Sequence, residues 1–124
     1  MTNKKADKLK EKIMYDLGEE IRAYLRDGKF KECEKAIYRA MYKYPHAAAP
    51  HNLLGIYLEK TGNHIEAMRH FRAACDLEPT YLPAEQNLIV YGTFCPGRKV
   101  CAFNLKDCDV KKTVKEGKSN DELF

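Results

Sequence analysis

The sequence contains none of the short motifs that mark the common enzyme classes. It has no Gly-rich phosphate loop, no Gly-x-Ser-x-Gly nucleophile, no His-Glu-x-x-His metal motif and no paired-carboxylate constellation. No two of its four histidines lie four residues apart, and His64 and His70 fall on different faces of one predicted helix. We therefore expect ordinary surface or capping roles for the histidines, no catalytic residues, and a protein that is not an enzyme.

Cysteine is present, but in no pattern that favours a disulfide framework or a metal site. The five cysteines leave at least one unpaired, and no Cys-x-x-Cys pair occurs. Cys95, Cys101 and Cys108 are not spaced like a zinc knuckle, and no fourth ligand lies nearby. We expect no metal ion and no cofactor, with a zinc or redox role for these three thiols as the alternative.

Long apolar runs and a secretory signal are also missing. No apolar stretch approaches the roughly 18–20 residues that span a bilayer. The first residues, MTNKKADKLKEK, are charged and have no apolar segment behind them. Unpaired cysteines without a signal favour a reducing compartment. We therefore expect a cytoplasmic protein without a membrane span.

The composition that is present is that of one soluble domain. The chain has 124 residues, 44% of them apolar and 32% charged, which is sufficient for one continuous core. The net charge of +4 lies in the flanks, because residues 14–94 hold ten Lys/Arg and eleven Asp/Glu. Basic flanks make weak nucleic-acid binding an alternative function, although such flanks are more often simply solvated.

An internal repeat organises the chain. A shift of 34 residues superposes turn, small and large residues without a gap: Gly28 on Gly62, Ala40 on Ala74, Pro45 on Pro79, Tyr24 on Leu58, Cys33 on Ala67 and Ile37 on Phe71. Apolar spacing predicts helices over about 6–26, 30–43 and 81–91, with a helical hairpin over 52–79. In the first helix, an apolar stripe runs from Leu9 to Leu25.

The residue types of the second repeat have physical reasons that do not depend on any resemblance. Gly62 can adopt positive φ and end the first helix of the hairpin, and Pro79 cannot continue the second. Asn63 is expected to cap the second helix, with Glu66 completing a capping box. Gly55 is small enough for two helices to approach closely, and Phe71 is expected to fill the space between them.

This repeat resembles the tetratricopeptide repeat (TPR) family. The matching residues are Leu54-Gly55, Gly62, Ala67, Phe71, Ala74 and Pro79, although His51 stands where the family favours Trp and Leu58 where it favours Tyr. The resemblance implies an all-α array of antiparallel helix hairpins forming a short right-handed superhelix. The expected divisions are a basic extension of the first helix (1–13), repeats at 14–47 and 48–81, a degenerate repeat or cap at 82–115, and a tail at 116–124.

The end of the third repeat is ambiguous. The 34-residue register places Cys101, Leu105 and Cys108 as a small–large–small core set and predicts a helix over about 98–112. The alternation of Cys101, Phe103 and Leu105 supports a competing β-hairpin. We favour the helix because it keeps the register of the two earlier repeats.

The resemblance also implies a function. In this family the first helix of each pair lines a concave groove that binds peptides, so we expect a non-catalytic adaptor or chaperone-like module with a protein or peptide partner. The groove candidates are Tyr15, Arg22, Arg26, Asn52, Ile56, Glu59, Lys60, Gln86 and Val90. The arginines and Lys60 favour an acidic partner. The family's carboxylate clamp is absent, and Tyr38 with Tyr42 offers an alternative, an exposed aromatic patch for self-association.

Overall fold

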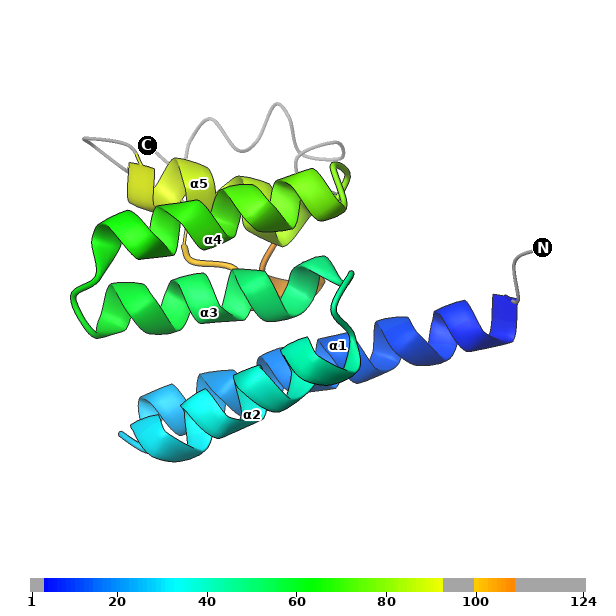
Figure 1. Cartoon of the computed structure of the whole chain (residues 1–124), viewed down its shortest axis with the longest axis horizontal. Helices are drawn as coiled ribbons and strands as arrows, with labels where there is room; N and C mark the ends of the chain where they lie inside the picture. The colour runs from blue at the N-terminus through cyan, green and yellow to red at the C-terminus, as the bar shows by residue number, and fades with distance from the viewer. Residues whose placement is uncertain (1–3, 93–99, 109–124) are drawn as a thin grey trace, which may run out of the picture.

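The computed structural model describes residues 4–92 and 100–108 of the chain. Within these residues the protein is all-helical and has no strand (Figure 1). The elements are α1 (Lys4–Arg26), α2 (Phe30–Lys43), α3 (Ala48–Lys60), α4 (His64–Leu77), α5 (Leu82–Gly92) and a single 3₁₀ turn, η1 (Leu105–Asp107). None of these helices is both long and apolar enough to cross a membrane.

The first two helices form a hairpin whose bounds agree closely with the predicted ones. Gly28 has φ of +73° in the turn between them, a conformation that favours glycine. The N-terminal part of α1 projects beyond the other helices (Figure 1). Leu9, on that projecting part, is 60% exposed. The predicted apolar stripe therefore reaches the core only from about Ile13 onward.

The second hairpin, α3 and α4, is the most closely packed pair. Gly62 turns the chain with φ of +88°, and Gly55 lies against the ring of Phe71 with no room for a side chain. The expected cap at Asn63 is wrong. Its side chain caps no backbone N–H of α4, and its amide nitrogen donates instead to Thr61 Oγ1 at 3.3 Å. Lacking that cap, α4 depends on its packing.

One apolar core runs through both hairpins. Its largest fully buried apolar side chains are Ile21, Ile37, Leu53, Ile56 and Phe71, contributed by α1 through α4. Phe71 also stacks on Tyr91 of α5, with ring centroids 5.6 Å apart. The core therefore joins all five helices through side chains at helical spacing.

After α5 the structure departs from the prediction. Residues 100–104 are neither helix nor strand, and only Leu105–Asp107 makes one 3₁₀ turn, so both the predicted helix and the competing hairpin are wrong for residues 100–108. The rest of the 98–112 range lies outside the described residues. Leu105, expected in the core, is 55% exposed, whereas Ala102 and Phe103 are buried. The backbone of Ala102 here bonds side chains of α3 and α5, whereas Asp107 and Cys108 bond carbonyls within the short turn.

Candidate functional site

Residues 100–108, which we call the inserted segment, run across α1, α3 and α5 (orange in Figure 1). Ala102 is fully buried, and Phe103 and Asn104 are 8% and 2% exposed. We call the surface of α1, α3 and α5 that contacts this segment the inner face. An irregular segment buried in this way must find side-chain partners for its backbone.

Two buried asparagines supply those partners at the centre. Asn87 of α5 donates from Nδ2 to the Ala102 carbonyl at 2.9 Å, and its Oδ1 accepts the Ala102 N–H at 2.8 Å. Asn52 of α3 donates to the same carbonyl at 2.9 Å and accepts a second N–H of Asn87 at 2.8 Å. Both asparagines are fully buried. The network satisfies the polar groups of the amides and of Ala102 together, as burial requires.

Gln86, the neighbour of Asn87 on α5, holds the segment at two further points. Its Nε2 donates to the Val100 carbonyl at 2.7 Å and to the Asp107 carbonyl at 3.1 Å. Among the described residues, the contacts that these three amide side chains make with the segment are hydrogen bonds to its backbone. Such contacts recognise the shape of an extended chain and tolerate different side chains.

Arg22 of α1 makes the main side-chain contact. Its Nη2 donates to Asp107 Oδ2 at 2.7 Å, and its guanidinium lies 4.6 Å from the centroid of the Phe103 ring. The same Asp107 oxygen accepts the backbone N–H of Phe103 at 2.9 Å. Arg22 Nε is buried without a hydrogen-bond partner among the residues that the structure describes. One arginine thus joins an aromatic ring and a carboxylate, a pairing that suits a planar guanidinium.

Glu19, one turn before Arg22, fixes the next residue of the segment. Asn104 donates from Nδ2 to Glu19 Oε2 at 2.9 Å and to the Tyr15 carbonyl at 3.0 Å. Hydrogen bonds from Asn104, Lys106 and Arg22, the first having the largest effect, together lower the pKa of Glu19 to about 2 against the opposing effect of burial. Glu19 is therefore held ionised by residues of the inserted segment and of its own helix.

Gly18 allows the segment to approach α1 this closely. A Cβ at this position would lie 2.8 Å from the Phe103 carbonyl oxygen and 2.9 Å from Asn104 Nδ2. Glycine inside a helix is destabilising by about 1 kcal/mol relative to alanine. Because the first obstacle is a backbone atom, a side chain here could not be accommodated by a rotamer change alone.

The predicted groove residues divide into three groups. Arg22, Asn52 and Gln86 bind the inserted segment directly, and Tyr15 contributes its backbone carbonyl. Ile56 is fully buried in the core, and Val90 is partly buried. The remaining three lie at the C-terminal ends of α1 and α3: Arg26 bonds Asp27, Glu59 bonds His64, and Lys60 is exposed.

The sequence reasoning missed Asn87, Glu19, Gly18 and the inserted segment itself. The repeat register aligns Asn52 with Gln86, so Asn87 fell outside the expected groove. A usable signal was present: Asn52, Gln86 and Asn87 are amides within the two most apolar helices, α3 and α5. An amide on an apolar helix must be paired when it is buried, and an extended backbone is one such partner.

Comparison with protein-family models, with curated proteins and with solved structures finds no match to this chain.

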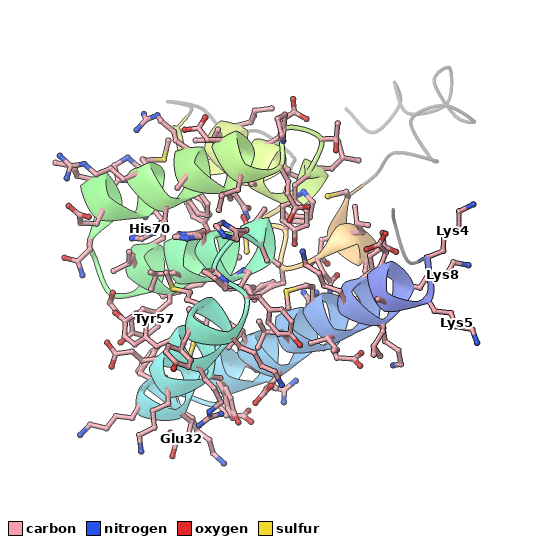
Figure 2. The ribbon with its side chains drawn as sticks, turned by 45° about the vertical axis from the view of Figure 1, so that its right-hand side comes forward. Lys4, Lys5, Lys8, Glu32, Tyr57 and His70 are labelled. Atoms are coloured by element: carbon pink, nitrogen blue, oxygen red, sulfur yellow. The ribbon has the colours of Figure 1, made fainter. Side chains whose placement is uncertain are left out.

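A cleft of about 830 Å³ adjoins the inserted segment, between the projecting part of α1 and the start of α5. Tyr15, 39% exposed, lines it together with Glu11, Tyr81 and Leu105. The basic end of α1 lies beside this region, where Lys4, Lys5 and Lys8 extend outward (Figure 2). The space next to the inserted segment is therefore open and mixed in charge.

Two further groups of titratable side chains lie away from the inner face. His51 of α3 and His70 of α4 form a part-buried stacked pair, with their centroids 5.3 Å apart and their Nδ1 atoms 3.1 Å apart, which differs from the surface or capping roles expected of the histidines. Cys33 is fully buried as expected, and burial raises its pKa to about 12. Within the described part of the chain, no three His, Cys, Asp or Glu side chains gather as metal ligands.

Proposed function

We propose that this protein is a non-catalytic interaction module, built as a TPR-like helical array, that binds an extended peptide of a partner protein on its inner face. The observation that supports this most directly is the pair of hydrogen bonds in which Asn87 donates to the Ala102 carbonyl and accepts the Ala102 N–H. Asn52 and Gln86 add backbone contacts on either side. The face thus already holds one irregular segment of chain by its backbone, as proposed for a partner peptide.

The chemistry of the face agrees with binding better than with catalysis. Its amides are engaged with backbone groups, and Arg22 engages a carboxylate and a ring. Neither arrangement activates a nucleophile or moves a proton. A partner segment that supplies an acidic side chain to Arg22 would satisfy the same donors. Because the described part of the chain contains no disulfide, the protein is proposed to work in the reducing cytoplasm.

The test uses full-length protein in which the inserted segment is loosened by Phe103→Ala together with Asp107→Ala, called the loosened variant below. A displayed library of random peptides is selected on this variant and, in parallel, on the loosened variant that also carries Asn87→Ala. Circular dichroism checks that both retain their helices. We expect peptides enriched on the first protein to be lost on the second, because Asn87 holds the backbone.

Enrichment of the same peptides on both proteins, or of none on either, would contradict binding at the inner face. A further control is Arg69→Ala in the loosened variant, since Arg69 pairs with Glu66 on the exposed surface of α4, away from the inner face. This substitution should leave the selected peptides unchanged.

Self-association is the second candidate function, favoured by the exposure of two neighbouring tyrosines. Tyr38 and Tyr42 of α2 are 49% and 90% exposed, as their spacing predicted. Exposed aromatic side chains are common in protein interfaces. Light scattering over a wide concentration range tests this: a mass that rises with concentration and returns to the monomer value in Tyr42→Ser would support it, and a constant monomer mass would exclude it.

A further inference from the structure

We propose that the inner face selects peptides with the pattern small–aromatic–Asn–x–x–acid, and that residues 102–107 are the protein's own copy of this ligand, which a partner must displace. The inference rests on the proposed function and adds the sequence class of the ligand and its competition with the inserted segment. Its basis is that each fixed position of the pattern makes a specific contact with residues of the inner face.

The first position must be small. Ala102 is fully buried, and its backbone lies within hydrogen-bond distance of both Asn52 and Asn87. A larger side chain at this position would push the backbone away from Asn52 and Asn87. The two amides would then lose the backbone groups of residue 102 that they bind. Gly18 enforces the same closeness one residue later, where the Phe103 carbonyl fills the place of a Cβ.

The second position is aromatic and the sixth is acidic because the Arg22 side chain contacts both residues. Arg22 places its guanidinium over the Phe103 ring and donates to Asp107. The ring is almost fully buried within the core cluster, and the Asp107 side chain is 12% exposed. An aromatic face and a carboxylate are the two groups that a guanidinium binds best at once.

The third position is asparagine because it needs a donor and an acceptor together. Asn104 donates to Glu19 and to the Tyr15 carbonyl, while its Oδ1 accepts the Lys106 N–H and so caps the start of the 3₁₀ turn. Aspartate would lack the donor and would meet the negative charge of Glu19. This 3₁₀ turn also brings Asp107 back to Arg22.

The two x positions, occupied by Leu105 and Lys106, contribute little to selectivity. Leu105 is apolar yet 55% exposed, and the Lys106 side chain is 51% exposed while it reaches Glu19. Side chains that remain in solvent add little selectivity. These positions are therefore free to vary in a partner, with a preference for Lys or Arg opposite Glu19.

A partner peptide can displace the inserted segment because most contacts between the segment and the inner face are polar. Ala102 and Phe103 are its only fully or nearly fully buried apolar side chains, and the ion pairs with Arg22 and Glu19 are partly exposed. A partner peptide can form the same bonds. Its apparent affinity for the intact chain is reduced by the fraction of molecules in which the segment is docked.

The probe is a fluorescent peptide of residues 100–108 carrying Cys101→Ser and Cys108→Ser, and its binding is followed by anisotropy. The proteins are full-length parent, the loosened variant and Leu105→Ala, a matched change on the solvent side of the segment. We expect the loosened variant to bind the probe about tenfold or more tightly than the parent does. Leu105→Ala should bind like the parent.

The sequence pattern is tested with altered probes on the loosened variant. A probe with the same residues in scrambled order, and one carrying Asp107→Lys, should each bind about tenfold or more weakly than the original. Equal binding of the original and scrambled probes would overturn the pattern. Equal binding of the probe by the parent and the loosened variant would overturn the competition.

Gly18→Ala separates docking from simple damage to the fold, because it removes no core side chain. In the parent it should expel the segment, so that the Cys101 thiol, partly buried in the docked state, reacts faster. In the loosened variant it should abolish probe binding, because the Cβ obstructs the probe as well. Unchanged reactivity and unchanged probe binding would overturn the proposed approach.

Two results distinguish the inference from the proposed function. If library peptides bind through Asn87 but lack the pattern, the proposed peptide-binding function is supported and the proposed sequence selectivity is wrong. If no peptide binds a folded, loosened chain, both fail. Should Phe103→Ala prevent folding, Asn104→Ala with Asp107→Ala loosens the same segment while keeping the buried ring, and the same outcomes apply.

Discussion

At the scale of single residues, Asn87 is the most constrained side chain of the inner face. It forms three hydrogen bonds from a fully buried position, two to the backbone of Ala102 and one to Asn52. Each partner is itself buried, so no water replaces a lost bond easily. A buried amide of this kind specifies where a chain segment lies more strictly than an apolar contact would.

Asn87→Ala should therefore lower the free energy of unfolding by about 1–3 kcal/mol, since it leaves buried groups of Ala102 and Asn52 without partners. Chemical denaturation measures the change. The matched control is Asn63→Ala, which removes an exposed asparagine that caps no helix N–H and should alter stability by less than about 0.5 kcal/mol. Equal effects of the two substitutions would contradict the Asn87 network.

The His51–His70 pair predicts a second residue-scale effect, a loss of stability in mild acid. Burial lowers the pKa of both rings below the ordinary 6.5, and the proximity of His70 lowers that of His51 further. The histidines therefore bind protons more readily in the unfolded chain than in the folded one. The contribution of the neutral pair to the free energy of unfolding is present above about pH 6.5 and is lost as the pH falls below it. If both rings were protonated, the Nδ1 atoms would both be donors and could not bond.

Thermal unfolding at about pH 7.5 and about pH 5 measures this loss. Glu66 raises the pKa of His70 and opposes the burial effect without removing it. His70→Met removes one titrating partner and should flatten the pH profile relative to the parent. A parent profile that is already flat over this range would rule the effect out.

At the scale of elements, the hairpin of α3 and α4 depends on close approach. Gly55 lies directly against the ring of Phe71, and Phe71 stacks on Tyr91 of α5. Three helices thus meet around one ring. Their packing, rather than capping, stabilises α4, because its N-terminal Asn63 makes no cap. Helices in proteins commonly gain most of their stability in this way.

Gly55→Ala should destabilise the protein by about 1–3 kcal/mol, because the added methyl overlaps the Phe71 ring in a filled core. The helix propensity of alanine opposes this by only about 1 kcal/mol. Gly92→Ala is the control, since a Cβ there meets only the flexible end of Met68. Chemical denaturation of both variants measures the difference, and a stabilised Gly55→Ala would contradict the packing.

At the scale of the whole molecule, the inserted segment ties the first hairpin to the last helix. Asn104 reaches α1, 89 residues earlier in the chain, while Ala102 is held by α3 and α5. The described residues therefore form one body closed by a segment near the end of the chain. Docking of this segment is expected to respond to charge as well as to substitution.

Acid should release the inserted segment before it melts the helices. Because Asn104 and Lys106 hold the pKa of Glu19 near 2, ionised Glu19 favours docking above its ordinary pKa of 4.5. This contribution is lost as the pH falls from about 4.5 toward 2. The chemical shift of the Ala102 amide proton, which bonds Asn87, measures docking.

Glu19→Gln is the matched variant for this titration. It keeps an oxygen that can accept from Asn104 but cannot titrate, so the Ala102 amide should lose much of its dependence on pH in this range. If the parent and Glu19→Gln follow the same pH profile, docking is not coupled to Glu19.

The sequence by itself determined the positions of the helices and turns. Gly28 and Gly62 take positive φ, α4 ends just before Pro79, and apolar spacing located all five helices because these causes act within a few residues. The resemblance to the TPR family, applied to the predicted helices, included Arg22, Asn52 and Gln86 among the expected groove residues. Only the tertiary structure decided what lies on the inner face. Asn87, Gly18 and His51 with His70 act through partners 15 to 85 or more residues away. Residues 100–108 combine such distant hydrogen bonds with a short local turn, and no local sequence pattern records the distant ones.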